Sequence, residues 1–93
     1  MPSGPWLQNA VETGVSVLPL AVAQALPKGA FAKLSNSYEE FWVIVDKVLG
    51  QGRYIGVVDS EMNMAEPGAV SLGTVLEFTF CHVIKAYNNG QEM

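Results

Sequence analysis

The hydrophobic positions of this chain follow two different periods, one in its first third and another in the remainder. In the first third, apolar residues recur at the i, i+3, i+4, i+7 spacing of an amphipathic helix, at Leu7, Ala10, Val11, Val15, Leu18, Val22 and Ala25. Gly14 and Pro19 interrupt this spacing, because both residues end or kink helices. The pattern predicts helices near residues 5–13 and 19–26, or one kinked helix, within a helical segment at residues 1–28.

The rest of the chain has a period of two, which is typical of strands with one buried face. Strand candidates are bounded by clusters of Gly, Pro, Asn and Ser, and they cover residues 31–34, 41–49, 53–59 and 75–80. Residues 83–87 are expected to form either a last short strand or a turn. Residues 60–71 are expected to form a long loop and residues 88–93 a flexible tail. The expected fold class is α+β in one domain, residues 1–93. In it, the helical segment packs on a small antiparallel, barrel-like sheet of four to five strands at residues 29–87.

The strongest strand candidate, residues 41–49, carries apolar side chains on both of its predicted faces. Trp42 lies on one face and Phe41 on the other, since successive side chains of a strand point in opposite directions. A strand that is apolar on both faces is typical of one covered on both sides, so we expect Trp42 in the core. Glu39 and Glu40 precede this strand. Because neighbouring side chains in extended backbone point in opposite directions, the two carboxylates do not suit a cooperating acid and base.

Composition and charge narrow the classes of function. Of the 93 residues, 49% are hydrophobic and 15% charged, which suits a globular domain. The net charge is −4 and the five basic residues are dispersed, which disfavours binding to a nucleic-acid backbone. The longest apolar run, Val15–Leu26, is too short to span a bilayer. A secretory signal would begin with basic residues, and no basic residue precedes Lys28. We therefore expect a cytoplasmic protein that does not bind membranes.

Residues that carry chemistry are sparse in this sequence. Cys81 and His82 are adjacent, and a zinc site needs four ligands at fixed spacings. We expect Cys81 to be a small buried hydrophobe and His82 a hydrogen-bonded residue that closes a strand. The carboxylates Asp59, Glu61 and Glu66 do not have the spacing of a calcium-binding loop. The sequence therefore predicts no catalytic residue, no metal site and no cofactor.

Five short motifs follow one another along the second part of the chain. They are a strand with a lysine, a strand with Trp-Val, a Gly-containing strand that ends in an acidic turn, a Gly turn and an Ile-containing closing segment. They read Phe31-Ala32-Lys33-Leu34, Glu40-Phe41-Trp42-Val43, Tyr54-Ile55-Gly56-Val57-Val58-Asp59, Leu72-Gly73-Thr74 and His82-Val83-Ile84.

Through these motifs, residues 29–87 resemble the YegJ-like domain of unknown function found in small bacterial and phage proteins. Two positions depart from the family pattern. Ser60-Glu61-Met62 stands where the family has Asn-acidic-Pro, and Lys85-Ala86-Tyr87 stands where it has Asp-Trp. The resemblance implies an α+β fold and a bacterial or phage origin, and it implies no particular activity.

The function that the sequence favours is a non-catalytic protein-interaction module, an accessory protein of a bacterium or phage. Tyr54 and Tyr87 are candidate contacts because they combine an apolar ring with a polar tip. Met62 and Met64 are candidates because methionine adapts to irregular surfaces. The expected partner is another protein, or a second copy bound through a sheet edge. A small nucleic-acid-binding β-barrel is the alternative, and an enzyme or metal-binding protein is less favoured.

Overall fold

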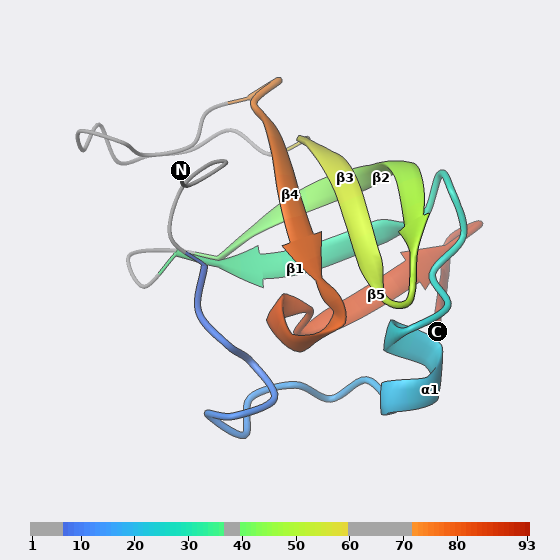
Figure 1. Cartoon of the computed structure of the whole chain (residues 1–93). Helices are drawn as coiled ribbons and strands as arrows, with labels where there is room; N and C mark the ends of the chain where they lie inside the picture. Colours follow the sequence, from blue (N-terminus) through green and yellow to red (C-terminus); the bar gives the residue numbers. More distant parts are fainter. Residues whose placement is uncertain (1–6, 37–39, 60–71) are drawn as a thin grey trace.

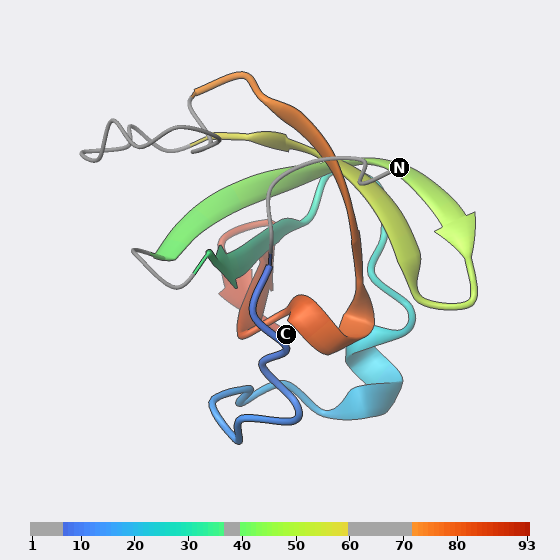
Figure 2. The ribbon, with the colours of Figure 1, turned by 60° about the vertical axis from the view of Figure 1, so that its left-hand side comes forward.

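The computed structural model describes residues 7–36, 40–59 and 72–93. Its main element is a six-stranded antiparallel sheet with the strand order β4-β3-β2-β1-β5-β6 (Figure 1). The strands are β1 (Phe31–Ser35), β2 (Glu40–Gly50), β3 (Arg53–Val58), β4 (Val75–Thr79), β5 (Lys85–Asn88) and β6 (Gln91–Glu92). The first four strands form a meander, and β5 returns to pair with the free edge of β1. Figures 1 and 2 show that the sheet is strongly bent, so that it partly encloses one of its faces.

The antiparallel sheet predicted from the sequence is confirmed, with six strands rather than four to five. Residues 88–93, expected as a tail, contain the end of β5 and all of β6. These two strands are joined by Asn89 and Gly90, which have φ angles of 54° and 78°. Positive φ at both central residues is the backbone that a two-residue hairpin turn requires, and Asn-Gly is the sequence that adopts it most readily.

The predicted N-terminal helix, or kinked helix pair, packed on the sheet is wrong, and with it the α+β fold class. Within the described residues the helical elements are α1 (Leu20–Ala23), four residues long, and a 3₁₀ turn, η1 (Phe80–His82). Gly14 has a φ of 77° and Pro19 lacks an N–H, so a continuous helix cannot form across them. Several backbone N–H groups of this segment donate instead to carbonyls that are distant in the sequence. Gln8 donates to Ser35 (2.8 Å), Ala10 to Cys81 (2.8 Å) and Val17 to Ile84 (2.9 Å).

The core lies between the enclosed face of the sheet, here called the inner face, and the N-terminal segment, residues 7–30 (Figure 2). Side chains of the inner face are almost fully buried: Ala32, Leu34, Phe41, Val43, Val45, Tyr54, Val58, Leu76, Phe78 and Ala86. Leu18, Ala23 and Leu26 of the N-terminal segment complete this cluster. The segment is thus mostly irregular in structure, and its apolar side covers the inner face of the sheet.

Tyr54 fixes the N-terminal segment to the inner face. Its side chain is 0% exposed, and its hydroxyl donates a hydrogen bond to the carbonyl of Ala23 (2.6 Å). The same oxygen accepts the backbone N–H of Leu26 (3.0 Å). Burial raises the pKa of the Tyr54 hydroxyl above its usual 10.0, although the hydrogen bond from Leu26 opposes the rise. The ring packs against Phe78 with centroids 5.3 Å apart.

The opposite face of the sheet, here called the outer face, carries the side chains that alternate with the core. On β2, Phe41 and Val43 are at most 1% exposed, whereas Trp42 and Ile44 are only half-buried. The expectation that Trp42 belongs to the core is therefore wrong. The N-terminal segment covers the inner face (Figure 2), and Trp42 on the opposite face stays half-buried.

Candidate functional site

Strand register arranges the outer face as two parallel rows that run across the sheet. One row contains Lys85, Lys33 and Trp42, because Lys33 of β1 lies opposite both of the other residues. The next row is apolar and is formed by Tyr87, Phe31, Ile44, Val57 and Val75 from five successive strands. Apolar side chains are thus gathered in a continuous band on a surface of the protein.

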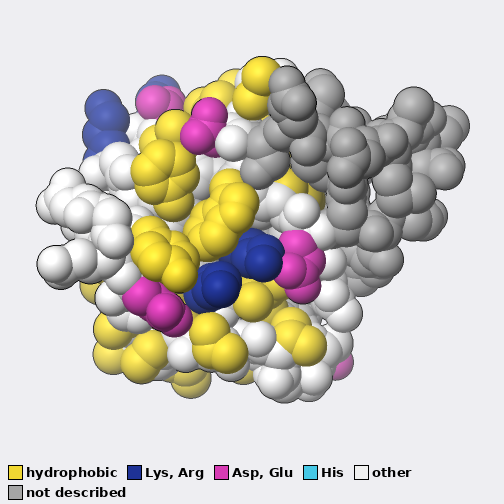
Figure 3. Space-filling model, turned by 180° about the vertical axis from the view of Figure 1, so that it is seen from behind, with side chains coloured by type: hydrophobic (Ala, Val, Ile, Leu, Met, Phe, Trp, Pro, Cys, Tyr) yellow, Lys and Arg dark blue, Asp and Glu magenta, His cyan; other side chains and the backbone are white. Residues whose placement is uncertain are grey.

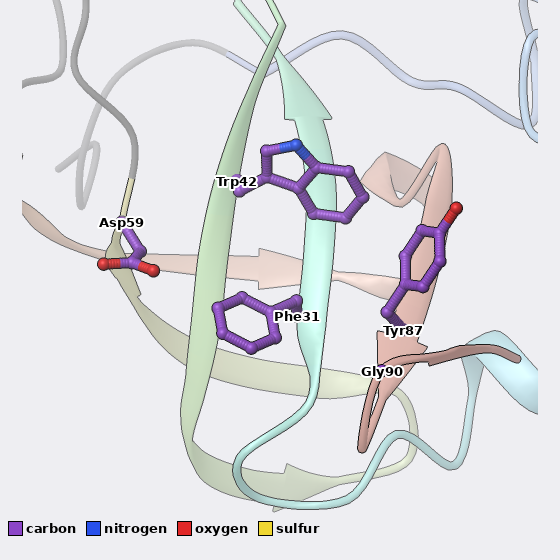
Figure 4. A pocket seen from close by; sticks show the side chains of 5 residues that line it. All are labelled: Phe31, Trp42, Asp59, Tyr87 and Gly90. Atoms are coloured by element: carbon purple, nitrogen blue, oxygen red, sulfur yellow. The ribbon is translucent and has the colours of Figure 1, made fainter.

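Two aromatic rings meet across this face. Trp42 on β2 and Tyr87 on β5 have ring centroids 5.5 Å apart at an interplanar angle of 65°, an edge-to-face contact. Strand β1 lies between β2 and β5 in the sheet, so the two rings reach toward each other over it (Figure 4). Phe31, on β1, lies beside the pair. Large rigid rings from three neighbouring strands therefore share one small area of the outer face.

An open depression of about 370 Å³ lies at this place and is lined by Phe31, Trp42, Asp59, Tyr87 and Gly90. We call it the aromatic hollow. The side chain of Phe31 is 37% exposed within it. Asp59 directly follows β3, and its backbone N–H donates to the carbonyl of Trp42 (2.8 Å), which fixes its position beside β2. Gly90 belongs to the β5–β6 turn, so that turn forms one wall of the hollow.

Charged side chains surround the aromatic pair unevenly. The ammonium of Lys33 forms an ion pair with Glu40 (2.8 Å) and lies 5.8 Å from the centroid of the Trp42 ring. The ammonium of Lys85 lies 6.0 Å from the centroid of the Tyr87 ring. Neither lysine lines the aromatic hollow, whose lining includes Asp59. Figure 3 shows this face with hydrophobic side chains at its centre, basic side chains beside them and acidic ones nearby.

Four contact residues were proposed from the sequence, and of the two that the structure describes, Tyr54 and Tyr87, it brings Tyr87 into the site. Tyr54 is fully buried and holds the N-terminal segment, so its side chain does not reach the surface. Met62 and Met64 lie outside the described residues. Sequence reasoning missed Phe31, Trp42 and Gly90 as members of a common site, and it weighed Asp59 only as a metal ligand.

His82 has a structural environment. Its Nδ1 accepts the backbone N–H of Thr79 (3.1 Å) at the start of the 3₁₀ turn, as expected of a histidine that closes a strand. Burial lowers the pKa of the His82 imidazole below 6.5. Cys81 is half-buried rather than buried as expected, and its thiol is free. Within residues 7–36, 40–59 and 72–93, no three His, Cys, Asp or Glu side chains are grouped as metal ligands.

Comparison of the chain with protein-family models, with curated proteins and with solved structures finds no match. The resemblance to the YegJ-like domain therefore stays a prediction. In the described part of the chain, no helix has both the length and the apolar character needed to cross a bilayer.

Proposed function

We propose that this protein is a non-catalytic module that binds a segment of another protein in the aromatic hollow. The observation that carries the proposal is the convergence of Phe31, Trp42 and Tyr87 from three adjacent strands around an open apolar depression. Tryptophan and tyrosine supply large contact areas with few rotatable bonds, and they are enriched among the residues that dominate binding energy. A half-exposed cluster of such rings has no counterpart on the inner face, where the aromatic side chains are buried in the core.

The outer face suits a partner better than the two edges of the sheet do. At the β4 edge, His82 already accepts the N–H of Thr79, and Glu77 is held by Arg53 (2.9 Å). The strand at the other edge, β6, contains two residues. Short strands and charged side chains are features that discourage pairing with an added strand. These observations support binding through the face rather than through strand addition or edge-to-edge self-association.

A random-peptide display selection against the purified protein tests the proposal. Peptides selected on the wild-type protein should lose at least tenfold in affinity for Tyr87→Ala and Phe31→Ala. They should keep it for Leu49→Ala, a matched control whose side chain is 44% exposed at the far end of β2. Each variant is first shown to be folded by its thermal unfolding transition. Selected peptides that bind all four proteins equally would place the binding surface elsewhere and contradict the proposal.

Binding of single-stranded nucleic acid is the second candidate function, and Lys33 and Lys85 are the observation that favours it. Their ammonium groups flank two rings that could stack on bases, the combination found in single-strand binding grooves. The ion pair between Lys33 and Glu40 and the net charge of −4 weaken the field that would attract phosphates. This function requires retardation of labelled oligonucleotides at low salt that disappears as salt is raised.

A further inference from the structure

The charge of the aromatic hollow indicates the chemistry of its occupant. Among the described residues that line it, Asp59 is the charged one. Lys33 and Lys85 lie near the rings without lining the hollow, and Lys33 is already paired with Glu40. An occupant that crosses the rings toward Asp59 therefore meets apolar surface followed by a carboxylate. A Lys or Arg side chain complements both, because its stem is apolar and its head is cationic.

The backbone of the sheet indicates the conformation of the occupant. The N–H and C=O groups of β1, β2 and β3 are directed toward neighbouring strands, since each of these strands is paired on both sides. The outer face therefore offers side chains and few backbone partners. A segment that needs no backbone hydrogen bonds to its receptor fits such a face best. Polyproline II has this property, because its backbone is solvated and its prolines present rigid apolar rings to aromatic side chains.

The width of the site sets the length of the segment. Tyr87 lies on β5 and Asp59 directly follows β3, so three strand-to-strand steps separate them. At the usual strand spacing, the part of this distance that runs across the strands is roughly 14 Å. Polyproline II rises about 3.1 Å per residue, so about five residues cover the distance. A proline packed against Tyr87 and Phe31 would thus be followed, about four positions away, by the basic residue that reaches Asp59.

We propose that the aromatic hollow binds a short proline-containing polyproline II segment with one Lys or Arg about four residues from the proline that contacts Tyr87. This inference rests on the proposed function and gives its partner a chemical class. An acidic peptide or a nucleic-acid strand would bring negative charge to Asp59. A second copy of this chain would place one net charge of −4 against another.

The fluorescence of Trp42 provides a direct test. Trp6→Phe leaves Trp42 as the remaining tryptophan of the chain. In that background, Trp42 emission is titrated with the acetylated peptide Ala-Pro-Pro-Ala-Pro-Arg-Ala. Two controls replace its Arg by Glu or all of its prolines by Gly. We expect saturable binding of the first peptide and a loss of at least tenfold for each control. Asp59→Asn should lower the affinity for the Arg peptide to that expected for an uncharged peptide. Asp59→Lys should bind the Glu peptide more tightly than the Arg peptide.

Three outcomes would overturn this inference, and they separate it from the proposed function. If display selects peptides that depend on Tyr87 but contain neither proline nor a basic residue, the hollow binds proteins and the proposed class is wrong. If Asp59→Lys binds the Arg and Glu peptides equally, the Asp59 carboxylate does not select a basic residue, and the inference is wrong. If no peptide binds and oligonucleotides quench Trp42 in a salt-dependent way, both proposals fail and the second candidate function replaces them.

Discussion

Trp42 and Tyr87 form an edge-to-face pair with ring centroids 5.5 Å apart, although strand β1 separates the strands that carry them. The pair therefore connects β2 to β5 above the sheet, in addition to the hydrogen bonds that connect both strands to β1. It also places two rings of a candidate binding surface in fixed mutual orientation without burying them. The same contact can thus be studied both as part of the fold and as part of the site.

A double-mutant cycle on Trp42→Ala and Tyr87→Ala measures the contribution of the pair to folding. We expect a coupling free energy of about 0.5–1.5 kcal/mol from urea unfolding, the usual range for aromatic pairs. As a reference, Phe41→Ala removes a neighbouring ring that is 1% exposed, so its cost should be about 3–5 kcal/mol, larger than that of Trp42→Ala. Equal costs for Phe41→Ala and Trp42→Ala would mean that Trp42 is covered in solution.

Tyr54→Phe tests the attachment of the N-terminal segment. The substitution keeps the ring but leaves the carbonyl of Ala23 and the N–H of Leu26 without their hydroxyl partner. Buried polar groups that lose a hydrogen bond cost about 1–3 kcal/mol, so the free energy of unfolding should fall by that amount. Hydrogen exchange at the Leu26 amide should accelerate as well. Tyr87→Phe, on the surface, serves as the control and should change stability by less than about 0.5 kcal/mol.

Gly56→Ala tests how tightly the inner face is packed. A Cβ at this position would lie 2.8 Å from Cε1 of Phe78 and 3.2 Å from side-chain atoms of Val43. Both neighbours are buried, so one of them must move, and such overpacking costs about 1–3 kcal/mol. The urea midpoint should fall accordingly. An unchanged midpoint would show that the core has room at this point of β3.

The stability of the protein should fall as the pH decreases below 6.5 because of His82. Burial holds the folded-state pKa of this imidazole below 6.5, the value expected in the unfolded chain. As the pH drops through 6.5, the unfolded state binds a proton that the folded state does not, and stability is lost until the folded pKa is reached. Urea midpoints at pH 7.5 and 5.5 measure this loss. His82→Asn should show a smaller loss between the two values, and an identical loss would assign the effect to other groups.

The strands could be predicted because their alternation is strong and their turns are marked by Gly and Asn. On β1, Phe31 and Lys33 alternate with Ala32 and Leu34, and the structure places the first pair outward and the second in the core. On β2 both faces are apolar, so alternation separates Trp42 from Phe41 without deciding which one is buried. The register decides it, because Lys33 lies opposite Trp42 and Leu34 lies opposite Phe41.

The predicted N-terminal helices are wrong because the apolar spacing of the N-terminal segment arises without a helix of that length. Ala10, Leu18, Ala23 and Leu26 are buried, whereas Val11, Val15 and Val17 are exposed. Long-range hydrogen bonds to carbonyls of β1 and of the chain after β4 hold this segment against the sheet, and the spacing of apolar residues in the sequence does not reveal such contacts. Gly14 and Pro19 are stronger evidence against a helix here than the apolar spacing is for one.

The aromatic hollow depends on contacts between strands, and a single-strand pattern does not contain them. Tyr87 could be proposed from its residue type alone. Gly90 could have been found as well, since Asn89-Gly90 is a strong hairpin signal that turns the chain back beside Tyr87. The meeting of Phe31, Trp42 and Asp59 required the register of three strands.

The return of β5 to β1 also constrains the order in which the protein can form during synthesis. The N-terminal segment and β1 leave the ribosome before Tyr54 and β5, which hold them, have been made. Until then, β1 has an unpaired edge and the apolar side of the segment has no sheet to cover. Nascent chains that stall before β5 should therefore depend on chaperones, and folding should complete only after the polypeptide is released past residue 88.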